Sequence, residues 1–150
     1  MGSLMREMRE TDGFTRDGPG WGLGWSKWHE NKRRDRQAVE FAFFEDHEEV
    51  ARARIFPKSR LDAPYVGLPA EPYVEIDLVV VRDDKICTGI GSWAISSLVH
   101  LYQGHEMIAF SAAPAEGFWV EIGWTRAVRR HRDDFAAALF HLPIQAKNLH

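Results

Sequence analysis

A buried strand that runs into a glycine-bearing turn and then a helix is the feature that most restricts the fold. Residues 73–81 end in a continuous Leu-Val-Val-Val run, which predicts a strand buried on both faces, as in the centre of a sheet. Residues 89–92 (Gly-Ile-Gly-Ser) then open a segment with helical apolar spacing up to Tyr102, and Gly104 supplies a stop. Glycines at a helix start leave backbone N–H groups accessible, and these groups suit a phosphate or pyrophosphate.

Composition limits the class of protein. A chain of 150 residues that is 45% hydrophobic is long enough for one globular domain with a sizeable core. The single cysteine, Cys87, excludes an internal disulfide, and the net charge of −3 does not favour a protein that coats nucleic acid or anionic membrane. No apolar run approaches the roughly 18 residues that a membrane span needs, and residues 1–13 lack the apolar core of a signal peptide. We therefore expect a cytoplasmic protein.

The remaining segments predict an α+β, or mixed α/β, domain. Residues 39–44 and 50–56 read as two strands of a hairpin, and the Ala/Ile-Arg alternation of the second predicts a half-buried strand that ends at Pro57. Prolines punctuate a long loop over residues 57–73, a length that is often functional. Further predicted elements are a strand over 106–110, a brief helix after Pro114, and strands over 125–130 and 135–142.

The N-terminal segment has a different composition. Residues 1–20 are polar, and we expect them to be mobile or loosely attached. Residues 21–28 carry three tryptophans, which would either cover an edge of the core or form an aromatic wall of a substrate site. The charged run 32–36 reads as a solvated connection. We divide the chain into a partly disordered extension, 1–36, and a single domain, 37–150.

Two motifs, taken with this order of elements, resemble the GNAT acyltransferase family. They are Ile-Cys-Thr-Gly-Ile-Gly at residues 86–91 and Phe-Trp-Val-Glu-Ile-Gly-Trp at residues 118–124. The resemblance covers about residues 38–142 and is clearest over 74–125. It implies an acyl-CoA N-acyltransferase fold, with a central mixed, mostly antiparallel sheet flanked by helices.

The resemblance also implies a cofactor and an activity. The cofactor is acetyl-CoA (CoA), and the activity is transfer of its acetyl group to a primary amine of a small molecule or protein. The central strand would run along the pantetheine arm, and the glycine turn would give backbone N–H groups to the pyrophosphate. The residues implied for cofactor binding are Val79, Val80, Val81, Ile86, Cys87, Thr88, Gly89, Ile90, Gly91 and Ser92.

Two carboxylates precede this turn. Glu75 lies 14 residues before Gly89, the spacing at which the histone-acetyltransferase branch of the family places its general base, although a surface carboxylate at a strand start would read the same. A base is chemically sensible because an amine nucleophile is protonated at neutral pH. Asp77 shares a strand face with Glu75 and would attract a cationic amine, so we assign it, together with Trp119, to the substrate side of the site.

Two departures from the family pattern put catalysis in question. Ile86 stands where the family often has Arg or Gln, leaving Lys85 or Arg82 as the nearest cations. Trp119 stands where many members have the tyrosine that protonates the departing thiolate, and an indole cannot practically give up its proton. Ser111, Tyr102 or water would have to act as the acid; otherwise activity is weak or lost. The alternative function is therefore a catalytically weak or inactive acyl-CoA-binding regulatory module.

The other residue groups carry weaker signals. Cys87 reads as a small apolar filler rather than a nucleophile, and His100 and His105 read as surface residues, so we predict no metal site. Arginines and a histidine over 126–132 form a basic cluster that would permit a third hypothesis, a toxin that acetylates aminoacyl-tRNA; the net charge does not favour it. The expected partners are acetyl-CoA and an amine, with no membrane and with nucleic acid disfavoured; a homodimer is left open.

Overall fold

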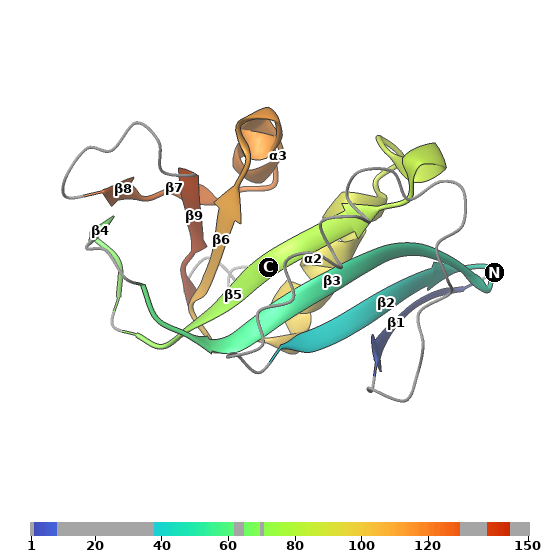
Figure 1. Ribbon diagram of the computed structural model, residues 1–150, viewed down its shortest axis with the longest axis horizontal. Helices are drawn as coiled ribbons and strands as arrows, with labels where there is room; N and C mark the ends of the chain where they lie inside the picture. The colour runs from blue at the N-terminus through green and yellow to red at the C-terminus, as the bar shows by residue number, and fades with distance from the viewer. Residues whose placement is uncertain (1, 9–37, 62–64, 70, 130–137, 145–150) are drawn as a thin grey trace.

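A seven-stranded sheet organises the molecule (Figure 1). The computed structural model describes residues 2–8, 38–61, 65–69, 71–129 and 138–144. The strand order is β1-β2-β3-β5-β6-β9-β7, and within this sheet only β5 and β6 pair in parallel. The strands are β1 Ser3–Met8, β2 Val39–Glu45, β3 Glu48–Ser59, β5 Tyr73–Val81, β6 Met107–Ser111, β7 Thr125–Arg126 and β9 Ala138–Leu142.

The other elements are short apart from one helix. Strands β4 and β8 form a separate two-stranded sheet. Helix α2 connects the parallel strands, as a crossover between them requires. The bounds are β4 Tyr65–Val66, β8 Val128–Arg129, α2 Ile90–Leu101, α3 Glu116–Glu121, and 3₁₀ turns at Asp83–Lys85 and Ala113–Ala115.

This architecture confirms the predicted fold class and most of the predicted elements. The first hairpin closes through Asp46 and His47, whose φ angles of 50° and 70° give the left-handed turn that matches strand twist. The helix predicted from residue 90 is α2, and Pro114 lies in the 3₁₀ turn that leads into α3.

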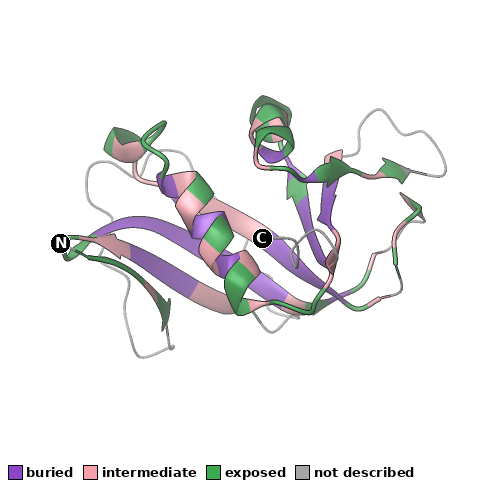
Figure 2. Cartoon of the chain, turned by 180° about the vertical axis from the view of Figure 1, so that it is seen from behind, coloured by how far each residue is buried: buried purple, intermediate pink, exposed green. Residues whose placement is uncertain are grey.

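Helix α2 covers one face of the sheet (Figure 2). Its buried side chains pack against Ala53 and Ile55 of β3 and Val74 and Ile76 of β5 in the main core. Tyr73, Ile108 and Leu139 form a smaller cluster. Because neighbouring strand residues point to opposite faces, this smaller cluster lies on the face away from α2.

The prediction that residues 1–20 are loosely attached is wrong for Ser3–Met8. These residues form β1, which pairs antiparallel with β2 along its whole length. Hydropathy did not reveal the strand because β1 lies at the sheet edge and its side chains are mostly exposed, so backbone hydrogen bonds hold it. Residues 9–37, which include the tryptophan-rich segment 21–28 and the charged run 32–36, lie outside the described residues.

Strand β3 differs from its prediction in two ways. It continues through Pro57 to Ser59, because the pairing with β5 is irregular between Phe56 and Ser59 and such an irregularity tolerates a residue without an N–H. Arg52 and Arg54 were expected on a half-exposed face, but their exposures are 0% and 1%. Arg52 is paired with Glu49, one of the ways in which a protein buries a charge.

Two further expectations are modified. Residues 78–81 were expected to be buried on both faces, but Leu78, Val79 and Val81 are only half buried. The segment 125–130 does not form one strand: β7 pairs with β9, and β8 pairs with β4 of the second sheet. Of the predicted strand 135–142, the described part is β9.

Candidate functional site

The parallel strands β5 and β6 diverge after three paired positions. Val74, Glu75 and Ile76 pair with Met107, Ile108 and Ala109, and the two strands then separate, as Figure 1 shows. A cleft of about 970 Å³ lies between them. Its walls are formed by Ile76, Asp77, Leu78, Val79, Val81, Ile86, Cys87, Gly89, Gly91, Ser92, Phe110, Ser111, Ala112, Ala115, Phe118, Trp119, Glu121 and Ile122.

A β-bulge marks the point of divergence. On β3, Ile55 pairs with Ile76 and Arg54 pairs with Leu78, so Asp77 is an extra residue on β5. A bulge bends its strand and increases the local twist. It therefore helps to turn the end of β5 away from β6, while β3 keeps β5 paired on its other edge as far as Val81.

The glycine turn lies at the other end of the cleft. Gly89 has a φ of 88°, which disfavours any residue with a Cβ, and it precedes the first turn of α2. A Cβ at Gly91 would lie 3.6 Å from the ring of Phe118 and 3.7 Å from Val81, two residues of the cleft wall. The turn thus brings backbone N–H groups and the N-terminal end of α2 to the cleft, an arrangement that suits an anion.

Most of the residues expected to bind the cofactor lie on this wall. Val79, Val81, Ile86, Cys87, Gly89, Gly91 and Ser92 line it. Val80 is buried and pairs with Arg52, because alternation turns its side chain away from Val79 and Val81. Ile90 packs in the core, and the Thr88 hydroxyl donates to the backbone oxygen of Lys85.

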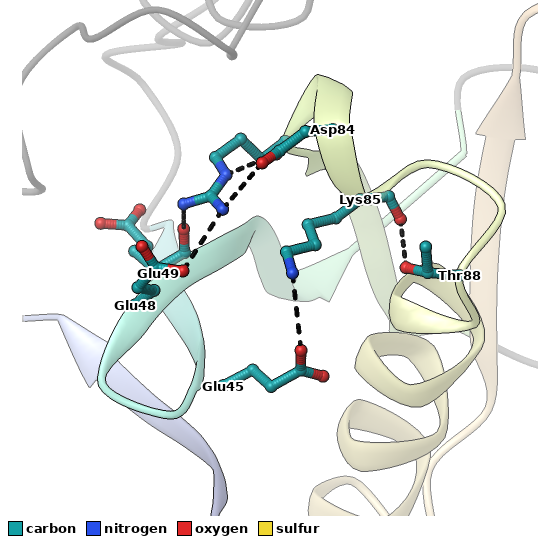
Figure 3. Close-up of polar contacts among 7 residues, drawn as sticks. Glu45, Glu48, Glu49, Asp84, Lys85 and Thr88 are labelled. Atoms are coloured by element: carbon teal, nitrogen blue, oxygen red, sulfur yellow. Dashed lines mark hydrogen bonds and ion pairs between the residues drawn. The ribbon is translucent and has the colours of Figure 1, made fainter.

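The two cations nearest this turn are held by carboxylates (Figure 3). Arg82 Nε donates to Asp84 Oδ1 at 2.6 Å, and Arg82 Nη1 donates to the backbone oxygen of Glu49 at 3.2 Å. The hydrogen bond to Asp84 is the main reason why the pKa of Arg82 is raised. Lys85 Nζ lies 3.8 Å from Glu45 Oε1. Among the described residues that line the cleft there is no Lys or Arg, so an anion there would meet neutral donors such as backbone N–H groups and the Ser92 hydroxyl.

Cys87 does not fit its predicted role as a filler. Its side chain is exposed on the cleft wall and its φ is 64°, a left-handed conformation in the tight turn before α2. The turn geometry, rather than core packing, decides its position.

The two candidate carboxylates occupy different places. Glu75 is 5% exposed and accepts a hydrogen bond of 2.5 Å from Ser59 Oγ, and it is not among the residues of the cleft wall. Asp77 lines the cleft, and its Oδ2 lies 3.5 Å from Nη1 of buried Arg54. Both carboxylates lie on the sheet face away from α2, because side chains alternate along a strand and their neighbours on β5, Val74 and Ile76, point to the α2 core. On β3 the same core contains Ala53 and Ile55. Arg54 is the partner that pattern analysis missed, because its alternation with Ala and Ile predicted exposure.

The candidate acid groups also separate. Trp119 is buried, and its ring centroid lies 4.8 Å from that of Trp124 and 6.3 Å from that of Phe140. Trp119 also lines the cleft. Ser111 lines the cleft and donates to the backbone oxygen of Ala112 at 2.9 Å. Tyr102 lies at the opposite end of α2 from the glycine turn and is not part of the wall.

The histidines and arginines singled out in the sequence are not among the described residues of the cleft wall. In the described ranges, no group of three or more His, Cys, Asp or Glu side chains could hold a metal ion, and no helix is long and apolar enough to cross a membrane. His100 and His105 are exposed and interact with Gln103. Arg126 pairs with Glu116 at 3.0 Å, and residues 130–132 of the basic cluster lie outside the described residues.

Comparison with known proteins gives no sequence match. No family model matches the chain, and no characterised protein matches it by sequence. Solved structures do match. AtaTR bound with acetyl-CoA is similar at a TM-score of 0.71 and 10% identity, over 98% of this chain and 96% of that chain. A bacterial toxin is similar at 0.67 and 13% identity, over 98% and 93%.

A third similar structure carries the family name. An acetyltransferase of the GNAT family from Streptococcus agalactiae 2603 matches at a TM-score of 0.56 and 8% identity, over 68% of this chain and 63% of that chain. At these identities the likeness concerns the fold. The diverging strands and the glycine turn were found independently in the same chain. The chain therefore has the fold of the GNAT acetyltransferases.

Proposed function

We propose that this protein is an N-acetyltransferase that transfers the acetyl group of acetyl-CoA to a primary amine. The observation that carries the proposal is the separation of β5 from β6 beside a glycine turn that opens α2. The separation leaves one edge of β5 facing a cleft, and the turn supplies N–H groups at the end of that cleft. A long thioester with a phosphate-rich end requires both features.

In this proposal the cofactor follows the cleft from α2 to the point where the strands meet. The pyrophosphate binds at residues 89–92, where N–H groups and the partial positive charge of the helix end favour an anion. The pantetheine lies along Val79 and Val81 and pairs with the free edge of β5. The thioester then reaches the region of Asp77.

The chemical step is direct attack of the amine on the thioester carbonyl. The nitrogen forms a bond to the carbonyl carbon, the carbon–sulfur bond breaks, and CoA leaves as a thiolate that takes up a proton. Glu75 is the proposed base, and because it is not on the cleft wall, it would accept the amine proton through a water molecule. Asp77 attracts the ammonium, and Ser111 or water supplies the proton to the thiolate.

The competing proposal is a regulatory module that binds acyl-CoA without turnover, and it is favoured by Trp119. Calorimetry with acetyl-CoA and CoA, followed by a thiol-release assay across a panel of amines, separates the two. Binding with thiol release supports the enzyme. Binding without release supports the module, and no binding at millimolar cofactor overturns both.

A second acceptor class is favoured by the extent of the structural matches. The bacterial toxin and AtaTR match over nearly the whole of both chains, whereas the Streptococcus acetyltransferase matches over about two thirds. This supports a toxin as a candidate; aminoacyl-tRNA as its acceptor is the hypothesis that the basic cluster of residues 126–132 permits. Incubation with radiolabelled acetyl-CoA and a mixture of charged tRNAs tests it; label in small amines but not in tRNA would exclude it.

The cytoplasmic location and the homodimer stay predictions, which cell fractionation and sedimentation would measure.

A further inference from the structure

The point where β5 and β6 separate is followed by a different side chain on each strand. Ile76 and Ala109 are the last paired residues, so Asp77 and Phe110 are the first residues beyond the branch on the two strands. Both line the cleft. The branch point of the cleft therefore carries a carboxylate on one strand and a phenyl ring on the other.

Both side chains lie on the sheet face away from α2. Asp77 contacts Arg54, whose neighbours on β3 point to the α2 core. Phe110 pairs across the strands with Leu139, which belongs to the cluster on the opposite face. In the proposed function α2 and the glycine turn hold the cofactor from one side, so Asp77 and Phe110 would lie on the side of the cleft that an acceptor approaches.

The Asp77 carboxylate is held in place by a buried arginine. Arg54 is 1% exposed, and its Nη1 lies 3.5 Å from Asp77 Oδ2. A carboxylate offers about four acceptor sites, so an ion pair with Arg54 and a bond to an ammonium are compatible. The wall's other carboxylate is Glu121, so both charged side chains of the described wall are acidic, which favours a cationic group beside Asp77.

The Phe110 ring is unusually open for its type. Phe110 is 40% exposed, although its neighbours Ala109 and Ser111 are buried. A bound group with an apolar part would bury this ring and gain apolar contact with it.

From this pair we infer a specificity that rests on the proposed function: the acceptor is a primary ammonium that carries an aliphatic or aromatic group close to the nitrogen. Asp77 binds the ammonium and Phe110 contacts the apolar group. Small amines without such a group, and amines at the end of long polar chains, bind Asp77 alone.

The test uses the whole chain, acetyl-CoA, and three amides that differ only in side chain: glycinamide, leucinamide and phenylalaninamide. The expected kcat/KM is at least about tenfold higher for the two apolar amides, which is the range an apolar pocket achieves. Phe110→Ala removes this preference through KM, and Phe110→Leu keeps the preference for leucinamide. Asp77→Asn raises KM for all three amides by a similar factor, roughly tenfold. Two control variants leave kcat/KM unchanged for all three amides. They are Leu101→Ala, at an exposed position of α2, and Asp83→Asn, in the turn after β5.

Calorimetry with acetyl-CoA on each variant keeps this inference distinct from the proposed function. Turnover with no preference in the wild type, or a preference that survives Phe110→Ala, overturns the inference and leaves the acetyltransferase intact. Absence of acetyl-CoA binding, or binding without acetylation of any amide or other amine, overturns both.

Discussion

Ser59 Oγ donates a hydrogen bond of 2.5 Å to Oε1 of Glu75, across the irregular end of the β3–β5 pair. This contact exists because β3 continues two residues past Pro57. It fixes a carboxylate that is 5% exposed and lies two residues before the bulge that turns β5 away from β6. A buried acceptor without a donor would cost about 1–3 kcal/mol, so the serine also stabilises the strand.

We expect Glu75→Gln to lower kcat by roughly 100-fold, because loss of a general base removes a factor of about 10² to 10⁴. Acetyl-CoA affinity should not change. Stopped-flow thiol release and calorimetry measure the two quantities. Glu7→Gln on the edge strand β1, an exposed position, is the matched control and should retain full activity. Unchanged turnover in Glu75→Gln would remove this residue from the mechanism.

Gly91→Ala should weaken acetyl-CoA binding by about tenfold or more without loss of stability. The added Cβ meets Phe118 and Val81 at ordinary contact distances, so the fold accepts it, and alanine in a helix is more stable than glycine by roughly 0.5–1 kcal/mol. The methyl group would, however, occupy the cleft at its phosphate end. Gly117→Ala in α3, where nothing lies within 4 Å, serves as the control for calorimetry and urea unfolding. Equal cofactor affinity in both variants would argue against cofactor at this turn.

Trp119→Ala should reduce the free energy of unfolding by about 3–5 kcal/mol, the usual loss for a buried aromatic side chain. Its ring packs against the rings of Trp124 and Phe140, and the contact with Phe140 joins α3 to β9. Val120→Ala, at the adjacent and 61% exposed position, should change it by less than about 0.5 kcal/mol. Urea titration followed by tryptophan fluorescence and circular dichroism measures both. Similar values for the two variants would show that Trp119 serves the cleft rather than the core.

Stability should fall as the pH rises above 10. Burial, followed by the charge of Glu7, raises the pKa of Tyr102 above its ordinary value of 10.0. Burial also raises the pKa of Tyr73, with Glu71 and Glu106 contributing. A phenol whose pKa is higher in the folded protein than in the unfolded protein contributes its full stabilisation at pH values below the unfolded-state pKa. This contribution is lost as the pH rises through the folded-state pKa. Urea unfolding between pH 8 and 11 should show the decline, with a shallower slope in Tyr102→Phe. An identical slope in that variant would assign the alkaline transition to other groups.

Local patterns in the sequence predicted the elements that position the site. The hairpin of β2 and β3, the strand β5, the glycine turn and helix α2 were all predicted, because turn residues and apolar periodicity act over a few residues. Patterns did not predict β1, since an exposed edge strand has no apolar face to mark it. They also placed Arg52 and Arg54 at the surface, because period-2 alternation distinguishes two faces without saying what covers each.

By itself, the sequence determined the class of fold and the place of the glycine turn before α2. Only the tertiary structure decided which side chains meet in the cleft. The bulge at Asp77 depends on the register between β3 and β5, and the positions of Asp77 and Phe110 just beyond the branch depend on where β6 leaves β5. Both are long-range relationships between strand positions that lie more than 20 residues apart in the chain. Glu75 and Asp77 look equivalent in the sequence, yet register and branch point bury one against Ser59 and place the other on the cleft wall.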